Sequence, residues 1–285
     1  MNRRLAVAAG GTAVGAALLL SGCNGDGSGN GTENMKLSAN EALLKSSQKT
    51  GESDTFKADL TVTGTGSDGG KVHATGQFRL RPAVKFSARI DEVSQGGRSL
   101  AGVKGQAIFT DDVLYAKVPQ LARFVSGGKQ WLKIDANQVA QRTGLDVQDL
   151  VNQIQKVDPA EQTKMFTGSK DARRVGTETV DGVKTTHYTG TVTVQDALNR
   201  LDAQARDKVS TWLDKDDKNA KINFNVWTDG QNLPRKLTST ATGSQGESGS
   251  VTVLYSDYGK SFSVNPPPSD QVGELSLGSI LGGGN

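Results

Sequence analysis

Strict alternation of apolar and polar residues over three consecutive segments is the feature that most limits what this chain can fold into. Phe56, Ala58 and Leu60 alternate with polar residues, and the same period of two returns in 71–81 and in 84–91. Successive side chains of a strand point to opposite faces of its sheet, so each segment is predicted to be a strand with one apolar and one solvated face. The short turns between them indicate an antiparallel meander.

Further strands are predicted along the rest of the chain. They are expected at 105–110, 113–118, 130–134, 173–180, 183–194, 221–228, 233–242 and 250–257. Asp181-Gly182 lies between two of these and is the strongest hairpin signal in the sequence. The prediction is one α+β domain, in which about ten strands form a long, curled antiparallel sheet with helices packed on its concave face.

Three helical regions are predicted, one before the first strand and two that interrupt the sheet. The first, 37–50, has Ser38 as a candidate N-cap with Glu41 three residues later. The second is an insert at 136–166, whose last piece begins with Asp158-Pro159. The third, 195–213, carries an amphipathic stripe of apolar residues.

The N-terminus has the order of a secretory signal. Arg3 and Arg4 precede an uncharged apolar stretch that ends in Leu20-Ser21-Gly22-Cys23. This ending matches the bacterial lipobox, and the match implies lipidation of Cys23, cleavage after Gly22 and anchoring by acyl chains. We therefore expect a signal peptide at 1–22 and a flexible, Gly-rich tether at 23–36, with the folded domain at 37–268 and a flexible tail at 269–285. A short transmembrane helix is the alternative interpretation of the apolar stretch.

Composition and charge exclude several kinds of site. The single cysteine rules out an intrachain disulfide framework and a multi-cysteine zinc site. Lys and Arg number 33 and Asp and Glu 30. Loss of Arg3 and Arg4 would leave 33 − 2 = 31 cations against 30 anions, which gives no indication of nucleic-acid binding or of a polybasic membrane patch.

A search for catalytic motifs is negative. The two histidines, His73 and His187, fall on the polar side of predicted strands, and neither belongs to a metalloprotease or hydrolase motif. A G-x-G-x-x-G pattern at 64–69 is followed by a strand instead of a helix, so it is interpreted as a hairpin turn. We expect neither an enzyme nor a metal or cofactor site.

Three stretches in the second half carry a family resemblance. They are Val180-Asp181-Gly182-Val183-Lys184-Thr185-Thr186-His187-Tyr188, Trp227-Thr228-Asp229-Gly230-Gln231-Asn232-Leu233-Pro234-Arg235-Lys236, and Tyr255-Ser256-Asp257-Tyr258-Gly259-Lys260 with Pro266-Pro267 after it. In their order and spacing they resemble the actinobacterial LppX/LprA/LprF/LprG lipoproteins of the LolA-like group. The resemblance covers about 37–268 and implies a half-barrel of antiparallel strands that encloses helices and an apolar cavity for lipid acyl chains.

The register then gives candidates for the walls of that cavity. They are Leu60, Val62, Phe78, Leu80, Phe86, Ala88, Ile90 and Tyr188. Ordinary core packing is the alternative for each of them.

The resemblance also implies the function. We expect a lipoprotein on the outer face of the bacterial cytoplasmic membrane that binds or carries an acyl lipid or glycolipid for envelope lipid transport. Export through the general secretory route is expected, and the Arg3-Arg4 pair leaves the twin-arginine route open. The alternative function is a structural or signalling lipoprotein that binds a protein partner and carries no lipid.

Overall fold

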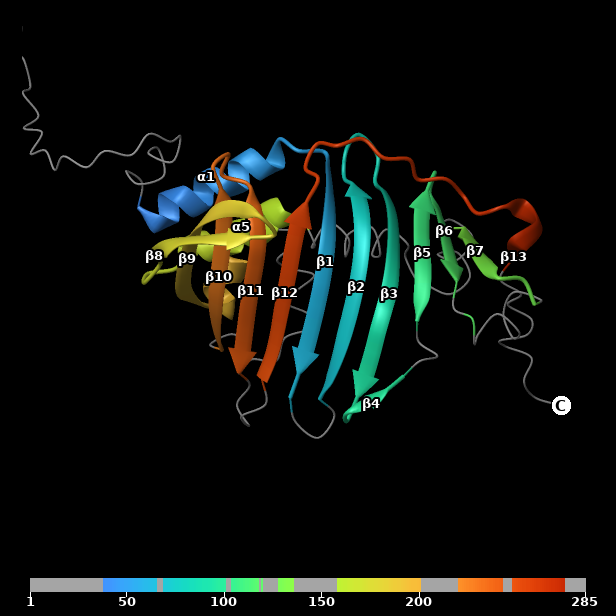
Figure 1. Cartoon of the computed structure of the whole chain (residues 1–285), viewed down its shortest axis with the longest axis horizontal. Coiled ribbons are helices and arrows are strands. Elements are labelled where there is room, and N and C mark those ends of the chain that lie inside the picture. Colours follow the sequence, from blue (N-terminus) through green and yellow to red (C-terminus); the bar gives the residue numbers. More distant parts are fainter. Residues whose placement is uncertain are drawn as a thin grey trace, which may run out of the picture. The chain divides into compact units, whose positions relative to one another are not determined.

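The computed structural model describes residues 38–65, 69–100, 104–117, 119, 128–135, 158–200, 220–242 and 248–274. Within them, thirteen strands form a single sheet (Figure 1). The strands are β1 Thr55–Gly64, β2 Gly70–Arg79, β3 Lys85–Gln95, β4 Arg98–Ser99, β5 Gly105–Thr110, β6 Val113–Lys117, β7 Trp131–Asp135, β8 Arg173–Val180, β9 Val183–Thr193, β10 Lys221–Asp229, β11 Pro234–Thr242, β12 Ser248–Ser256 and β13 Val272–Glu274. The predicted curled antiparallel sheet is confirmed, and it has more strands than the ten or so expected. The extra ones, β4 and β13, are two and three residues long, too short to show a period.

The strand order joins two meanders that are far apart in the sequence. It runs β13-β7-β6-β5-β3-β2-β1-β12-β11-β10-β9-β8, with β4 paired to β3. All pairs between neighbours are antiparallel except β13–β7, which is parallel. β12 pairs with β1 from Lys57↔Ser256 to Gly64↔Gly249, which joins the meander of the second half to that of the first. The sheet stays open, with β8 and β13 at its two edges.

The tail predicted for 269–285 does not begin where expected. Residues Ser269–Gln271 form a short 3-10 helix, η5, and β13 then pairs with β7 through Val272↔Trp131. The Pro266-Pro267-Pro268 run therefore does not end the regular structure. A three-residue parallel strand is held by its neighbour and not by any local pattern, so the sequence gives little sign of it.

Two of the helices, α1 and α5, begin at the predicted caps. α1 spans Ala39–Gly51, and Ser38 closes a capping box in which its Oγ accepts from the Glu41 amide while its own amide donates to Glu41 Oε2 over 2.8 Å. α5 spans Pro159–Met165 with Asp158 as N-cap and continues into the 3-10 helix η3, Phe166–Gly168. α6 spans Val194–Leu198 at the start of the predicted third helix. The remainder of that helix and the insert at 136–157 lie outside the described residues.

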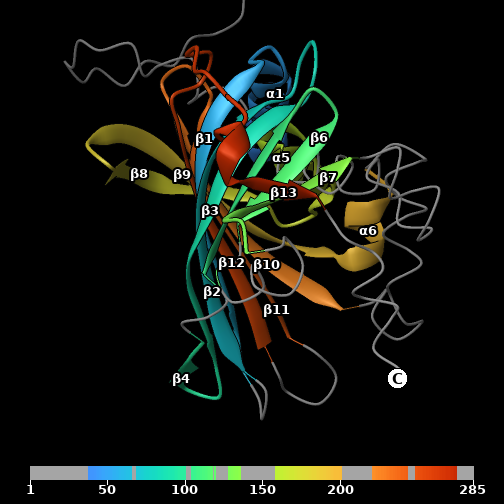
Figure 2. The same cartoon turned by 90° about the vertical axis from the view of Figure 1, so that its right-hand side faces the viewer.

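These helices cover one part of one sheet face. In Figure 2, which shows the sheet from its side, α5 and α6 lie on the same side, and α1 joins that side through Leu43, which is buried in one core with Phe224 and Leu237. Phe166 of η3 stacks on Phe224 with ring centroids 4.4 Å apart. We call the sheet face that carries these helices the inner face, and the opposite face the outer face. The main core therefore lies between the helices and the strands β9 to β12 and β1.

Candidate functional site

The inner face carries three parallel rows of side chains that cross the strands. The first row is aromatic: Phe56, Phe78, Phe86 and Phe109 are cross-strand neighbours on β1, β2, β3 and β5. Their ring centroids are 5.3, 6.1 and 5.7 Å apart, so the rings stack in a continuous ladder. Three of the four rings are almost fully buried. This ladder is a continuous apolar row across four neighbouring strands.

The second row consists of small residues. Beside the ladder lie Ala58, Gly76, Ala88, Ala107 and Ala116, one on each of β1, β2, β3, β5 and β6. Gly76 is required locally, because a Cβ there would lie 2.8 Å from the Phe78 ring. The other members leave a low apolar strip, which we call the small-residue strip. All but Ala58 are only half-buried.

The third row is aliphatic and leads away from the helices. It runs from Tyr188 through Val226, Leu237 and Val253 to Leu60, and then through Ala74 to Ile90. Exposure changes along it: Tyr188 is 1% exposed and Ile90 is 37% exposed. The inner face thus has a half that the helices bury and a half, over β2 to β6, where apolar side chains are partly open.

Two tyrosine hydroxyls are buried on the inner face, Tyr255 on β12 next to β1 and Tyr188 on β9 in the helix-covered half. Tyr255 is the β12 neighbour of Ala58 in the small-residue row, and Tyr188 belongs to the aliphatic row. Both are at most 3% exposed, and neither hydroxyl has a hydrogen-bond partner in the part of the chain that the structure describes. Burial raises the pKa of both phenols, so both stay protonated and can donate. A buried hydroxyl without a partner costs about 1–3 kcal/mol.

The predicted cavity residues differ in what they pack against and in how far they are buried. Leu80 and Tyr188 are buried in the helix-covered core, against which Leu60 and Phe78 also pack. Phe86 forms a second, smaller core with Phe109. Among the remaining candidates, Ala88 packs beside this second core, Val62 is half-buried and Ile90 is the most exposed. All of them except Leu80, which follows the end of β2, lie in strands. Whether any of them lines a lipid cavity stays a prediction.

Several members of the rows were missed from the sequence. Ala107, Phe109, Leu114 and Ala116 continue the inner face onto β5 and β6. The alternation within these two short strands was the available signal. Tyr255 could have been predicted in the same way, because it lies on the same side of the last long strand as Val251 and Val253. Cys23, the predicted lipidation site, lies outside the described residues.

The outer face is polar, as predicted, and both histidines lie on it. His73 Nε2 is 3.0 Å from Asp59 Oδ1, and His187 Nδ1 is 2.8 Å from Glu178 Oε1. The other oxygen of Glu178 accepts a hydrogen bond from Trp227 Nε1, whose ring stacks on His187. Within the described ranges no group of three or more His, Cys, Asp and Glu side chains is placed to hold a metal ion. No helix of the same ranges is long and apolar enough to cross a membrane.

Comparison with known proteins places the chain in a family. It is 30% identical over 247 residues to an uncharacterized 31.2 kDa protein encoded in the rplA-rplJ intergenic region of Streptomyces griseus, covering 83% of this chain and 79% of that protein. The chain belongs to the family of this Streptomyces protein. A putative lipoprotein of Streptomyces coelicolor is a more distant relative, 25% identical over 178 residues, which make up 62% of this chain and 54% of that protein. No protein-family model matches the chain.

Similar solved structures include two mycobacterial proteins, LprF and the lipoprotein LppX. LprF from Mycobacterium bovis is 13% identical with a TM-score of 0.47, over 81% of this chain and 97% of that one. LppX from Mycobacterium tuberculosis is 14% identical with a TM-score of 0.42, over 80% and 98%. Both proteins are among those that the sequence was predicted to resemble.

Proposed function

We propose that this protein is a membrane-anchored lipoprotein that binds an acyl lipid on the inner face of its sheet. The observation that carries the proposal is the partly open apolar half of that face. There the small-residue strip lies between the phenylalanine ladder and the aliphatic row. A row of small residues between two rows of larger ones has the form of a shallow channel, which suits an unbranched hydrocarbon chain. Apolar surface of this kind is stabilised when it is covered.

The Tyr255 hydroxyl indicates the polar part of the proposed ligand. A purely hydrocarbon ligand on the strip would leave the hydroxyl of Tyr255 without a partner, whereas an ester carbonyl accepts a hydrogen bond from a protonated phenol. Because Tyr255 is the β12 neighbour of Ala58 at the end of the small-residue strip, an acyl ester could place its carbonyl at this hydroxyl and its chain along the strip. We therefore favour an acyl ester over a free hydrocarbon.

The anchor and the location belong to the same proposal. The lipobox ending at Cys23 and the name of the Streptomyces coelicolor relative, a putative lipoprotein, both support a chain held on the outer face of the cytoplasmic membrane by lipid at Cys23. The general secretory route is the proposed export path. We propose a binding and carrying role without catalysis, and the two hydrogen-bonded histidines of the outer face give no reason to add one.

Native mass spectrometry of residues 24–285 tests the lipid proposal. The wild-type chain should retain a co-purified acyl lipid, and Ala88→Trp should lose most of it because the indole fills the strip between Gly76 and Ala107. Thr240→Trp is the matched control, since Thr240 lies on the opposite face of the same sheet, in register with Asn223 and Ser250. This control should keep the wild-type lipid load.

The outcomes separate the two functions. A folded wild-type chain that carries no lipid from any expression host would overturn the proposal and favour the alternative of a lipoprotein that binds a protein partner. A folded Ala88→Trp chain with an unchanged lipid load would place the lipid elsewhere. If Ala88→Trp unfolds, residue 88 is part of a tight core, where enlarging a side chain costs about 1–3 kcal/mol, and the strip does not bind an acyl chain.

A further inference from the structure

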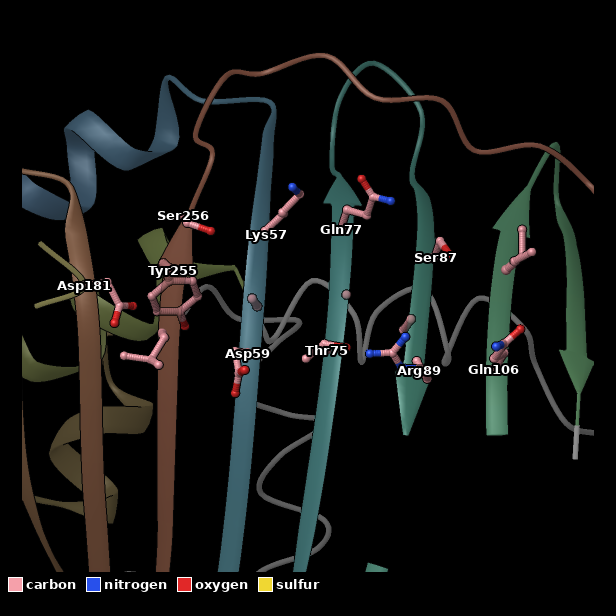
Figure 3. A pocket seen from close by; sticks show the side chains of 15 residues that line it. Lys57, Asp59, Thr75, Gln77, Ser87, Arg89, Gln106, Asp181, Tyr255 and Ser256 are labelled. Atoms are coloured by element: carbon pink, nitrogen blue, oxygen red, sulfur yellow. The ribbon is translucent and has the colours of Figure 1, made fainter. Parts of the chain in front are cut away.

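The outer face holds a pocket whose outward-pointing polar side chains the lipid proposal does not use. Ala58, Gly76, Ala88 and Tyr255 of the inner-face rows also line it, because they lie in the same strands between its outward-pointing residues. The pocket has a volume of about 730 Å³ and lies over β12, β1, β2, β3 and β5 (Figure 3). This volume falls in the range of about 300–1,000 Å³ that is usual for small-molecule sites. Two neighbouring cross-strand rows form its floor. One row is Ser256–Lys57–Gln77–Ser87–Ile108, and the other is Leu254–Asp59–Thr75–Arg89–Gln106.

A turn from a distant part of the sheet adds one further residue to this pocket. Asp181, at the tip of the β8–β9 hairpin, lines it together with the strands. The hairpin is tied to the outer face by Glu178 of β8, which accepts from Trp227 Nε1 of β10 over 2.9 Å. Figure 1 shows the hairpin crossing in front of β10 and β11 toward β12. The pocket is therefore lined both by the central strands and by the β8–β9 turn. The Glu178–Trp227 hydrogen bond links that hairpin to β10.

The charges of the pocket are balanced, and both of its cations are already paired. Two cations, Lys57 and Arg89, line it with two anions, Asp59 and Asp181. Lys57 Nζ lies 2.6 Å from Asp257 Oδ2, and Arg89 pairs with Asp91. Hydrogen bonds from Lys260 and Lys57 hold the pKa of Asp257 at about 2, so Asp257 stays charged and keeps Lys57 engaged. A polyanion would meet no unneutralised positive surface here.

Thr75 of the lining donates to Asp91 Oδ2, and four other uncharged polar side chains of the lining have no partner among the described residues. The side chains of Gln77, Ser87, Gln106 and Ser256 make no hydrogen bond within the part of the chain that the structure describes, and all four line the pocket. Amides and hydroxyls both donate and accept. Ile108 on β5 and Leu254 on β12 supply apolar contact from the two outermost strands of the lining. The chemistry that matches is an uncharged ligand with many hydroxyl groups and small apolar faces.

We infer that this outer-face pocket binds a neutral sugar. The hydroxyls of a pyranose or furanose ring would exchange hydrogen bonds with the two glutamine amides and two serine hydroxyls, and its C–H face would rest on Ile108 or Leu254. Asp181 would accept from a further hydroxyl at the hairpin side. The sugar belongs either to a free glycan or to the headgroup of a neutral glycolipid, because both present the same ring. The inference does not depend on lipid binding to the inner face.

The test uses the full chain in a detergent without a sugar headgroup. Binding is first measured on a printed array of neutral oligosaccharides, and the strongest binder is then titrated by calorimetry. The variant Gln77→Ala/Gln106→Ala should weaken binding about tenfold, since it removes two neutral hydrogen-bonding groups. Gln95→Ala is the matched control: Gln95 ends β3, outside the pocket lining, and its loss should leave the affinity unchanged.

A vesicle assay identifies the source of the sugar. Phosphatidylcholine vesicles with and without monogalactosyl diacylglycerol are compared, using the same variants. Binding of array sugars supports a free glycan, and binding only to the galactolipid vesicles supports a headgroup; in both cases the glutamine variant must be weaker than the control. Absence of binding in both assays, or equal binding by the two variants, overturns the inference. Lipid retention in the mass spectrum is measured independently, so failure here leaves the inner-face proposal standing.

Discussion

At the scale of single residues, the turns of this sheet depend on side chains that tolerate positive φ. Among the described residues, those other than glycine with positive φ are all Asp or Asn: Asp111, Asp112, Asp181, Asn232 and Asp257. Their short polar side chains reach the left-handed region at a lower cost than other types. Asp181 at +47° and Gly182 at +78° together form the predicted hairpin turn.

Gly182→Val tests this turn. A Cβ at 182 would meet no atom within 4 Å, so any cost comes from the backbone conformation alone. A β-branched residue at positive φ should lower the free energy of unfolding by about 1–3 kcal/mol, measured by urea denaturation. Gly64→Val is the control, because a Cβ there also meets nothing and its φ is not positive. Equal stability of the two variants would contradict the assigned turn.

At the scale of elements, the β10–β11 hairpin is held by one buried carboxylate. Asp229 is 5% exposed, and its Oδ1 accepts from the amides of Gln231 and Leu233, each over 2.9 Å. Its Oδ2 faces Arg235 with contacts of 2.8 Å to Nε and 2.7 Å to Nη2. The Asp229 carboxylate therefore holds both the turn and the start of β11.

Asp229→Ala should cost about 3 kcal/mol of unfolding free energy, because it leaves a largely buried Arg235 and two amides without their acceptor. Asp54→Ala is a matched control: Asp54 also pairs with an arginine, Arg81, at 2.8 Å, but both side chains are exposed. Loss of an exposed pair costs about 0–1 kcal/mol. Chemical denaturation of both variants gives the comparison, and an Asp229→Ala loss no greater than that of Asp54→Ala would show that the carboxylate is not needed.

At the scale of the whole molecule, the two sheet faces offer different chemistry from the same strands. On β1, Ala58 and Leu60 belong to the apolar rows, while Lys57 and Asp59 line the outer pocket. Strand alternation makes this possible without additional elements. A lipid site and a sugar site could then be occupied together, with the sheet as the wall between them.

Where the molecule resides is predicted to depend on Cys23. Cys23→Ala removes the thiol to which diacylglycerol would be attached, so the variant should remain an uncleaved precursor without the diacylglyceryl mass. Membrane fractionation and intact-mass measurement of the wild type and the variant give the comparison. Ser21→Ala is the control, because alanine is also accepted at that lipobox position and processing should be normal. A Cys23→Ala chain that is cleaved and lipidated like the wild type would contradict the anchor.

The sequence determined those features that arise from neighbours along the chain. Period-two alternation specified the strands and their apolar sides, Asp181-Gly182 specified a turn, and Ser38 with Glu41 specified the beginning of α1. Each depends on a few consecutive residues, so local propensity and side-chain direction suffice. For the same reason six of the eight proposed cavity residues were assigned to the inner side of β1, β2 and β3 correctly.

Only the tertiary structure decided which part of the apolar face is covered and what lies on the other side. The pairing of β1 with β12 joins Lys57 to Ser256 and Ala58 to Tyr255, and the packing of α1 and η3 on Phe224 and Leu237 buries one half of the face and not the other. The unpartnered tyrosine hydroxyls, the outer pocket and the parallel strand β13 all follow from such contacts. They join residues that are far apart in sequence, and no local pattern encodes which distant strand a strand will pair with, because that choice depends on the free energy of the whole packed sheet.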